Sequence, residues 1–225
     1  MTTKTRGRPR RQTLSRERVL EAAVAFADER GLEELSMRKL GQSLGVEAMS
    51  LYNHVADKDD LLDGIVDIVA RELEPPDPEL DWRAALRRCS MRSREVLLRH
   101  PWSAALAESR AQSGPARLGY LEALLEMLRG AGFSPSGAYR VNLFVDSYVY
   151  GFVLQEVAWP TESDESFDPA QDFAQRTASE RFPRLVEVAR VVADGDWDPA
   201  ADFERGLDLI LDGVETMLEA DRSAG

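Results

Sequence analysis

Apolar residues recur along this 225-residue chain every three or four positions, which is the spacing of amphipathic helices. The sustained alternation of apolar and polar residues that marks strands is missing from the sequence. The pattern therefore predicts an all-α protein, which capping residues, glycines and prolines divide into helices. The expected helices span residues 15–31, 36–45, 46–55, 57–73, 81–99, 101–111, 114–130, 136–158, 169–193 and 199–220.

A proline-rich, acidic stretch, EPPDPELD at Glu74–Asp81, separates a small set of helices from a larger one. We expect a three-helix helix-turn-helix domain at residues 15–73 and a helical bundle at residues 79–220. Residues 1–14 form a basic arm that we predict to be disordered. The polar, acidic segment Pro160–Asp172 is predicted to be a mobile loop.

Charge is distributed unevenly along the chain, whose formal net charge is −12. Residues 1–58 carry 11 lysines and arginines against 8 acidic residues, whereas residues 59–225 carry 17 against 32. The acidic part would repel a polyanion, and only the N-terminal quarter would attract one. If the protein binds nucleic acid, we expect the contact in that quarter.

Composition favours a globular protein of the cytoplasm. No apolar run approaches the ~20 residues of a membrane span, and the basic start MTTKTRGRPRRQ lacks the apolar stretch of a secretory signal. The single cysteine, Cys89, excludes an intramolecular disulfide, which fits a reducing compartment. We therefore expect no membrane partner.

Two short helices joined through Gly45 give the N-terminal unit the form of a helix-turn-helix. The residues spaced to face inward are Leu40, Leu44, Val46, Leu51 and Val55. The second helix turns methyl, hydroxyl, phenol and imidazole groups outward, and such groups contact thymine methyls, base edges and phosphates in a major groove. The outward residues are Ala48, Met49, Ser50, Tyr52, Asn53 and His54, with Arg38 and Lys58 at the margins.

The string LSMRKLGQSLGVEAMSLYNHVADKDDLL, with Phe26 and Gly31 upstream, closely resembles the DNA-binding unit of the TetR family of bacterial transcriptional repressors. The resemblance covers residues 15–70. It implies a set of DNA-facing positions, which are Arg38, Ala48, Met49, Ser50, Tyr52, His54 and Lys58.

The resemblance also implies different roles within this set. Tyr52, His54 and Lys58 would mainly grip phosphates. Ala48 and Met49 occupy positions that vary across the family, so they would select the operator. The operator itself does not follow from the sequence of the chain.

The arginines of RGRPRR, near the start of the chain, allow two interpretations. Arg6, Arg8 and Arg10 on an extended backbone suit a narrow, A·T-rich minor groove, and the string also looks like the core of an AT-hook. The alternative is a solubilising tail without a contact to DNA. The sequence leaves both open.

The C-terminal unit lacks the residue clusters of most catalysis. It has one histidine, His100, and one cysteine, with no glycine-rich phosphate loop after a strand and no His/Cys cluster at metal-ligand spacing. Its many acidic residues are typical of solvated helix faces. We predict a protein that is not an enzyme and that needs no metal or other cofactor.

Two helices of this unit have more apolar surface than one core can cover. The helix at residues 136–158 is apolar on more than one side, and the helix at residues 199–220 combines a long apolar stripe with Gly206 and Gly213. We expect both to form a four-helix bundle with their mates in a homodimer. The predicted interface residues are Tyr150, Leu154, Phe203, Leu207, Ile210, Leu211, Val214 and Leu218.

Three further strings, EMLRGAGFSPSGAYRVN, YGFVLQE and FERGLDLILDGVE, resemble the regulatory domain of the tetracycline-repressor branch of the same family. The resemblance implies a small-molecule pocket inside the bundle. Gln155 stands where that branch carries an acid, and no histidine follows His100. We therefore do not expect a magnesium–tetracycline chelate as the effector.

Several aromatic residues with a few polar tips suit a mostly apolar pocket for a planar or polycyclic ligand. For each residue the alternative is plain core packing, and for His100 it is a cap at the end of a helix. The candidate lining is His100, Trp102, Leu106, Leu125, Leu128, Phe144, Ser147, Tyr148, Gly151, Gln155 and Trp159.

These patterns together predict a ligand-responsive transcriptional repressor. Its homodimer would place two recognition helices in successive major grooves of a palindromic, double-stranded operator, and a small, largely apolar effector would release it. The alternatives are an activator or architectural DNA-binding protein without a ligand, and an enzyme that has reused the fold.

Overall fold

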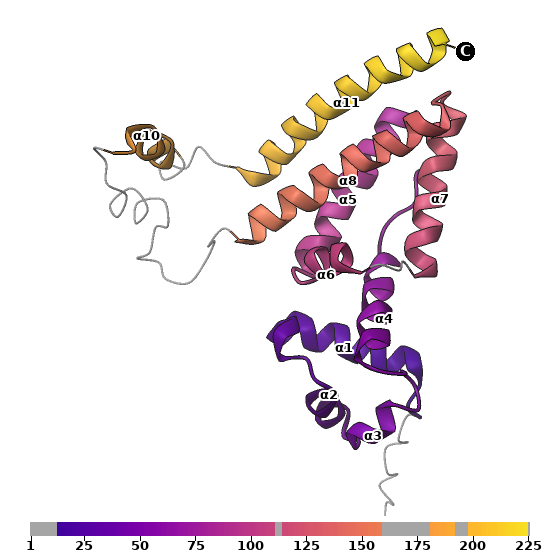
Figure 1. The fold of residues 1–225 in the computed structure, drawn as a ribbon, viewed down its shortest axis with the longest axis vertical. Coiled ribbons are helices and arrows are strands. Elements are labelled where there is room, and N and C mark those ends of the chain that lie inside the picture. The colour runs from indigo at the N-terminus through magenta and orange to yellow at the C-terminus, as the bar shows by residue number, and fades with distance from the viewer. Residues whose placement is uncertain (1–12, 111–113, 159–180, 192–197, 225) are drawn as a thin grey trace, which may run out of the picture.

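The computed structural model describes residues 13–110, 114–158, 181–191 and 198–224, and the regular elements among them are helices. Figure 1 shows the N-terminal helices gathered at one end of the molecule and the longer helices at the other, with α4 between them. The predicted all-α fold is confirmed. None of the described helices combines the length and apolar character needed to cross a membrane.

The elements of the N-terminal unit are α1 (Arg16–Arg30), the 3-10 turn η1 (Leu32–Glu34), α2 (Met37–Leu44), α3 (Ala48–Leu51) and α4 (Lys58–Ala70). Ser15 caps α1 and Ser36 caps α2, because each hydroxyl accepts the backbone N–H three residues further on at 3.3 Å. Gly45 ends α2 in the left-handed conformation (φ 68°) that glycine adopts without strain. The turn between α2 and α3 thus follows from local residue chemistry.

Residues 46–55, expected as one helix, form only the single turn α3, and Tyr52, Asn53 and His54 continue as a non-helical turn. One helical turn has little stability of its own, so tertiary packing determines its length. That packing comes from Leu51 and Val55, which are buried in the core of the unit. The helix expected at residues 57–73 also ends early, at Ala70.

The core of the N-terminal unit confirms three of the five inward-facing residues. Leu40, Leu51 and Val55 are buried, whereas Leu44 and Val46 are half-buried at its edge. The same cluster includes two residues from the following unit, Leu106 and Ala107 of α6, alongside Leu61 and Ile65 of α4. A shared core therefore joins the two units.

The described helices of the C-terminal unit are α5 (Trp82–Arg99), α6 (Ser103–Ser109), α7 (Pro115–Gly130), α8 (Pro135–Ala158), α10 (Pro183–Val191) and α11 (Pro199–Ala224). The expected break at Pro101 is confirmed, because α5 ends at Arg99. Within the described part of the helix expected at 169–193, residues 181 and 182 are not helical. Trp159 and the expected loop Pro160–Asp172 lie outside the described residues.

The core of this unit corrects most of the predicted dimer interface. α8 packs against α5, α7 and α11, and the inner stripe of α11 fills the space between them. Five predicted interface residues are 0–3% exposed in a single chain and cannot reach a partner: Phe203, Leu207, Leu211, Val214 and Leu218. The apolar stripe of α11 marked the core of the chain itself.

Candidate DNA interface and ligand cavity

α2 and α3 approach each other closely at Gly41. A Cβ atom there would lie 3.0 Å from the Val46 carbonyl oxygen and 3.2 Å from the Ala48 nitrogen, so glycine lets the two backbones meet. Across the turn, the Val46 N–H donates to the Gly41 carbonyl at 2.9 Å. These contacts fix the angle at which α3 is presented.

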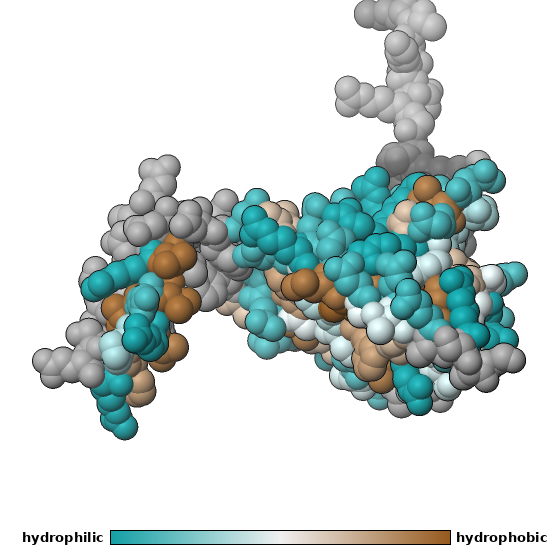
Figure 2. All heavy atoms as spheres, turned by 90° about the horizontal axis from the view of Figure 1, so that it is seen from above, coloured by the Kyte–Doolittle hydropathy of each residue, from teal (hydrophilic) through white to brown (hydrophobic). Residues whose placement is uncertain are grey.

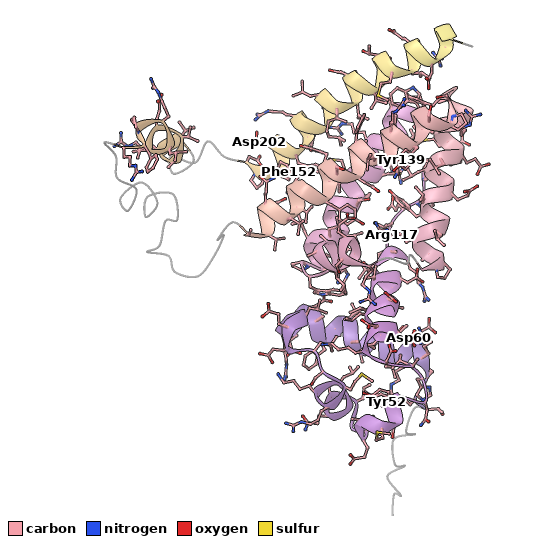
Figure 3. The ribbon with its side chains drawn as sticks, in the orientation of Figure 1. Tyr52, Asp60, Arg117, Tyr139, Phe152 and Asp202 are labelled. Carbon is pink, nitrogen blue, oxygen red and sulfur yellow. The ribbon has the colours of Figure 1, made fainter. Side chains whose placement is uncertain are left out.

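Tyr52 lies at the end of the molecule opposite α11 (Figure 3). The exposed fractions there are large, at 74% for Met49 and 44% for Tyr52. Of the predicted DNA-facing residues, the exposed ones are Arg38, Met49, Tyr52 and Lys58, and the half-buried ones are Ala48, Ser50 and His54. Arg6, Arg8 and Arg10 of the basic arm lie outside the described residues.

The polar side chains of this surface are not used inside the chain. Within the described residues, Arg38, Tyr52, His54 and Lys58 form no side-chain hydrogen bond or ion pair. Lys39 differs, because its Nζ lies 2.8 Å from Glu34 Oε2 and is occupied. These four side chains therefore carry polar groups that no other described residue engages.

An ion pair holds the segment that carries these groups. Arg16 of α1 donates to both carboxylate oxygens of Asp60 at 2.6 and 2.7 Å, and to the His54 carbonyl at 3.0 Å. The Arg16 guanidinium lowers the pKa of Asp60 below its usual value. Asp57 caps α4 by accepting the Asp60 N–H at 2.8 Å. The turn from Tyr52 to Lys58 is thus anchored at its far end.

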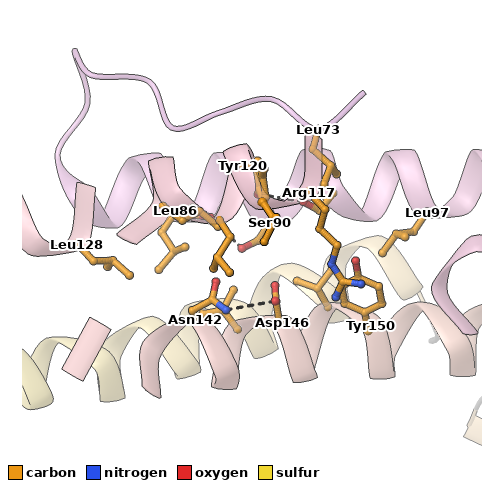
Figure 4. Close-up of a pocket in the computed structure, with 16 residues that line it drawn as sticks. Leu73, Leu86, Ser90, Leu97, Arg117, Tyr120, Leu128, Asn142, Asp146 and Tyr150 are labelled. Atoms are coloured by element: carbon orange, nitrogen blue, oxygen red, sulfur yellow. Dashed lines mark hydrogen bonds between the residues drawn. The ribbon is translucent and has the colours of Figure 1, made fainter. Parts of the chain in front are cut away.

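A cavity of about 200 Å³ lies between α5, α7 and α8 in the other unit (Figure 4). Leucines and valines form most of its wall, with a few polar groups among them. The polar lining residues are Ser90, Ser93, Arg117, Tyr120, Asn142, Asp146 and Tyr150. A mostly apolar cavity with a few convergent polar groups is the usual form of a small-molecule site.

Asp146 is the acidic residue of this lining. Burial raises its pKa to about 6, and the nearby Arg117 charge opposes that rise. Asn142, one turn earlier on α8, donates to it over a long 3.4 Å, and Asp146 forms no ion pair within the described chain. Arg117 instead donates to the Ala107 carbonyl at 3.1 Å and lies over the Tyr150 ring.

A second, smaller cavity of about 20 Å³ lies next to α4. It shares Arg117 and Tyr150 with the first cavity, and its other side is formed by α4 residues 66, 69 and 70. Ser103 lines it with a buried hydroxyl that has no hydrogen-bond partner among the described atoms. We refer to this space as the annex.

Hydrogen bonds connect α4 to the cavity wall. The buried carboxylate of Asp67 in α4 accepts the Ala116 N–H at 2.8 Å and the Arg117 N–H at 3.4 Å, and so caps α7. Arg110, after α6, donates to Asp63 of α4 at 2.5 Å and to Asp59 at 3.0 Å. Arg117 therefore lines the cavity with its side chain and is hydrogen-bonded to α4 through its backbone N–H.

The structure corrects the predicted ligand-binding role of three residues near Pro101. His100 Nδ1 lies 2.8 Å from Asp28 of α1, and its Nε2 lies 3.2 Å from Glu72. Trp102 donates to the same Asp28 at 2.7 Å, and Leu106 is buried in the core of the N-terminal unit. These residues join the two units and do not line the cavity.

Most other predicted pocket residues also lie elsewhere. Tyr148 donates to the Phe203 carbonyl at 2.9 Å and stacks on its ring, so it belongs to the core. Phe144, Ser147 and Gln155 are exposed on the outer face of α8. Leu125 and Gly151 are half-buried outside the cavity lining.

Two of the predicted residues line this cavity. Leu128, which the sequence assigned to the ligand pocket, is one of them. Tyr150, predicted for the dimer interface, lines it as well, and Leu154 and Ile210 remain exposed and half-buried respectively. The sequence reasoning missed Asn142 and Asp146, although an acid four residues after an amide in a mostly apolar helix was the available signal.

Two family models match the chain. "Bacterial regulatory proteins, tetR family" matches residues 19–65, and "Tetracyclin repressor-like, C-terminal domain" matches residues 74–218. The chain belongs to the TetR family. The members of this family are DNA-binding transcriptional regulators, so the predictions of a helix-turn-helix regulator and of a protein that is not an enzyme are confirmed.

Similar proteins support this assignment over most of the chain. An HTH-type transcriptional regulator of Saccharopolyspora erythraea is 35% identical over 214 residues, which cover 92% of this chain and 89% of the relative. The HTH-type transcriptional repressor DrrR1 of Streptomyces coeruleorubidus is 35% identical over 216 residues, covering 92% and 79%. The crystal structure of the Streptomyces coelicolor TetR family protein ActR in complex with actinorhodin matches with a TM-score of 0.76 at 29% identity, covering 91% of this chain and 98% of that chain.

Proposed function

We propose that this TetR-family protein is a repressor that binds a palindromic operator as a homodimer and leaves it when a small, largely apolar molecule fills the cavity. The observation that carries the proposal is the set of exposed, unpaired groups of Arg38, Tyr52 and Lys58 at the end of the helix-turn-helix. The repressor DrrR1 and the ActR–actinorhodin complex support both halves of it. The units would be a DNA-binding domain at 15–73 and a ligand-binding and dimerisation domain at 79–220.

The exposed groups divide into two chemical kinds. The phenol of Tyr52, the imidazole of His54 and the ammonium of Lys58 suit phosphate oxygens, which position the protein without reading sequence. Met49, with Ala48 and Ser50 beside it, suits thymine methyls and base edges in the major groove. The basic arm with Arg6, Arg8 and Arg10 would reach the adjacent minor groove, with an inert tail as the alternative.

Dimerisation is proposed on the outer faces of α8 and α11. These two helices pack together and leave apolar side chains in solvent, among them Phe144 at 47% and Leu209 at 72% exposed. In the view of Figure 2, exposed apolar residues lie among hydrophilic ones on the molecular surface. The paired faces would also bury Leu143 and Leu154, and they would form a four-helix bundle with the second copy.

Release is proposed to pass through α4. A ligand in the cavity contacts Arg117, whose backbone N–H is hydrogen-bonded to Asp67 of α4. A group that enters the annex would press directly on the α4 residues that form its wall. Since α4 carries the helix-turn-helix, a shift of α4 would move the two recognition helices out of register with grooves ~34–36 Å apart.

The DNA half of the proposal is tested with the double variant Tyr52→Phe, Lys58→Ala on duplexes selected from random sequence. Affinity should fall for all duplexes alike, and the slope of log affinity against log salt should flatten by about one. Lys39→Ala is the matched control, because its ammonium is already paired with Glu34. Unchanged binding by the double variant would contradict the phosphate-contact assignment.

The effector half is tested by screening planar and polycyclic compounds for loss of operator binding. A ligand must prefer the released state by ~10⁴-fold to turn a 1:99 population into 99:1, so a genuine effector produces a large change. A screen in which compounds raise the melting temperature and leave operator affinity unchanged would favour a DNA-binding protein without ligand control.

A further inference from the structure

At the polar end of the cavity, the carboxylate of Asp146 accepts few hydrogen bonds from the rest of the described chain. Figure 4 shows Asn142 and Asp146 rising from α8 toward the side chains of the opposite wall. The bond from the Asn142 amide, at 3.4 Å, is the one hydrogen bond that the described chain gives the Asp146 carboxylate. A carboxylate away from bulk water normally has several such bonds or an ion pair.

The charged and titratable groups around Asp146 do not supply that partner. From α7, Arg117 is held by the Ala107 carbonyl and by Glu108 Oε1 at 3.4 Å, so its charge is shared with another carboxylate. Tyr120, also of α7, meets Ser93 of α5 at 3.3 Å. The negative charge of Asp146 is therefore left without a direct counter-ion in the described structure.

We propose that the cavity selects amphipathic effectors with a basic amine, whose ammonium group pairs with Asp146 while an apolar ring system fills the leucine-lined part. This inference rests on the proposal that the cavity is the effector site. It names Asp146 as the residue that sets specificity and Asn142 as a second acceptor, through its carbonyl oxygen. A protonated amine neutralises the buried charge, which a neutral donor leaves in place.

Ligands with a carboxylate or a hydroxyl head should bind the cavity more weakly than the amine. A carboxylate head would meet the Asp146 charge at short range, and like charges in a cavity of low polarity repel strongly. A hydroxyl head can donate one hydrogen bond to Asp146 but leaves the carboxylate charged and poorly solvated. The expected order of affinity is therefore amine, then alcohol, then acid.

The affinity for the amine should also depend on pH, because a proton and the ammonium group compete for Asp146. Because the pKa of Asp146 is about 6, the carboxylate is mostly ionised at pH 7.5 and mostly protonated at pH 5. Amine affinity should then fall up to tenfold for each pH unit below about 6, since the proton competes with the ammonium. The other titratable groups near the carboxylate are Arg117, Glu108, Tyr120 and Tyr150.

The experiment uses three probes with one ring system: 1-naphthylmethylamine, 1-naphthylmethanol and 1-naphthoate. Their binding to the full chain is measured by calorimetry at pH 7.5 and pH 5. The amine should bind at least tenfold tighter than the alcohol at pH 7.5, and that margin should shrink at pH 5. Asp146→Asn should remove the preference for the amine and change alcohol binding by less than threefold.

Asp212→Asn is the matched control, because it removes the same formal charge from an exposed position on α11. It should leave the preference for the amine intact. Equal or tighter binding of the alcohol or the naphthoate would overturn the inference and leave the cavity as a ligand site. Absence of binding by all three probes would overturn it as well, while the operator and salt-slope measurements test the proposed function separately.

Discussion

At the helix-turn-helix end, Tyr52 and Lys58 are exposed to water and have no partner in the described chain. In the bundle, Asp146 stands in a leucine-lined cavity with one long hydrogen bond. Both sites keep polar groups unused. The first does so at little cost in folding free energy, whereas the second holds a poorly solvated charge at pH values above the pKa of Asp146.

The two sites should therefore respond differently to substitution. A surface group can be removed with little effect on folding, because nothing inside the chain depends on it. A cavity group that is poorly solvated destabilises the fold, and its removal should stabilise the protein while impairing recognition. Stability and binding should therefore change independently at the first site and in opposite directions at the second.

The largest expected effect on stability is the difference between substitutions on the buried and exposed sides of α3. Leu51 is fully buried, so Leu51→Ala should lower the free energy of unfolding by about 2–5 kcal/mol. Met49→Ala, on the exposed side, should leave stability within about 0.5 kcal/mol and change which duplexes are selected. Urea denaturation and selection from random DNA measure the two outcomes. A strongly destabilised Met49→Ala would show that the outer face of α3 is not free.

The next effect probes the connection between α4 and the cavity wall. A Cβ atom at Gly114 would overlap the Asp67 carboxylate, so Gly114→Ala should cost about 1–3 kcal/mol and weaken the response to ligand. Gly119 lies within α7, the helix that Gly114 precedes, with open space beside it. Gly119→Ala is thus the control, and it should stabilise by roughly 0.5–1 kcal/mol. Equal melting temperatures for the two variants would contradict the close contact.

The smallest effect concerns Asp146. Its pKa is raised from 3.8 to about 6 in the folded chain, so the fold loses stability as pH rises from about 4 to about 6. Asp146→Asn should therefore stabilise by roughly 1–2 kcal/mol at pH 7.5, after a discount for partial solvent exposure, and bring no gain at pH 4. Thermal unfolding at both pH values measures it. A gain of the same size at pH 4 would point to a cause other than the buried charge.

The helix-turn-helix could be predicted from sequence because its determinants are local. Ser36 and Gly45 set the ends of α2 by backbone chemistry, and exposed polar residues on a short apolar helix indicated a surface for a partner. The length of α3 could not be predicted, since one helical turn has no intrinsic stability and packing of Leu51 and Val55 decides where it ends.

The cavity could not be predicted from sequence because it depends on which faces of α5, α7 and α8 meet. Phe144 and Asp146 are two residues apart on α8, yet one is exposed and the other faces the cavity. Aromatic residues drew the prediction toward Phe144 and Tyr148, whereas the cavity is lined mainly by aliphatic residues. The apolar stripe of α11 likewise indicated burial correctly. Whether it is buried in the core of the chain or against a partner subunit could be decided only from the packing.

The most direct measurement is operator affinity at increasing concentrations of 1-naphthylmethylamine, paired with affinity for the amine in the presence and absence of operator. If the cavity controls the recognition surface through α4, the amine weakens operator binding, and operator weakens amine binding by the same factor. Operator affinity that stays constant while the amine saturates the cavity would contradict the account.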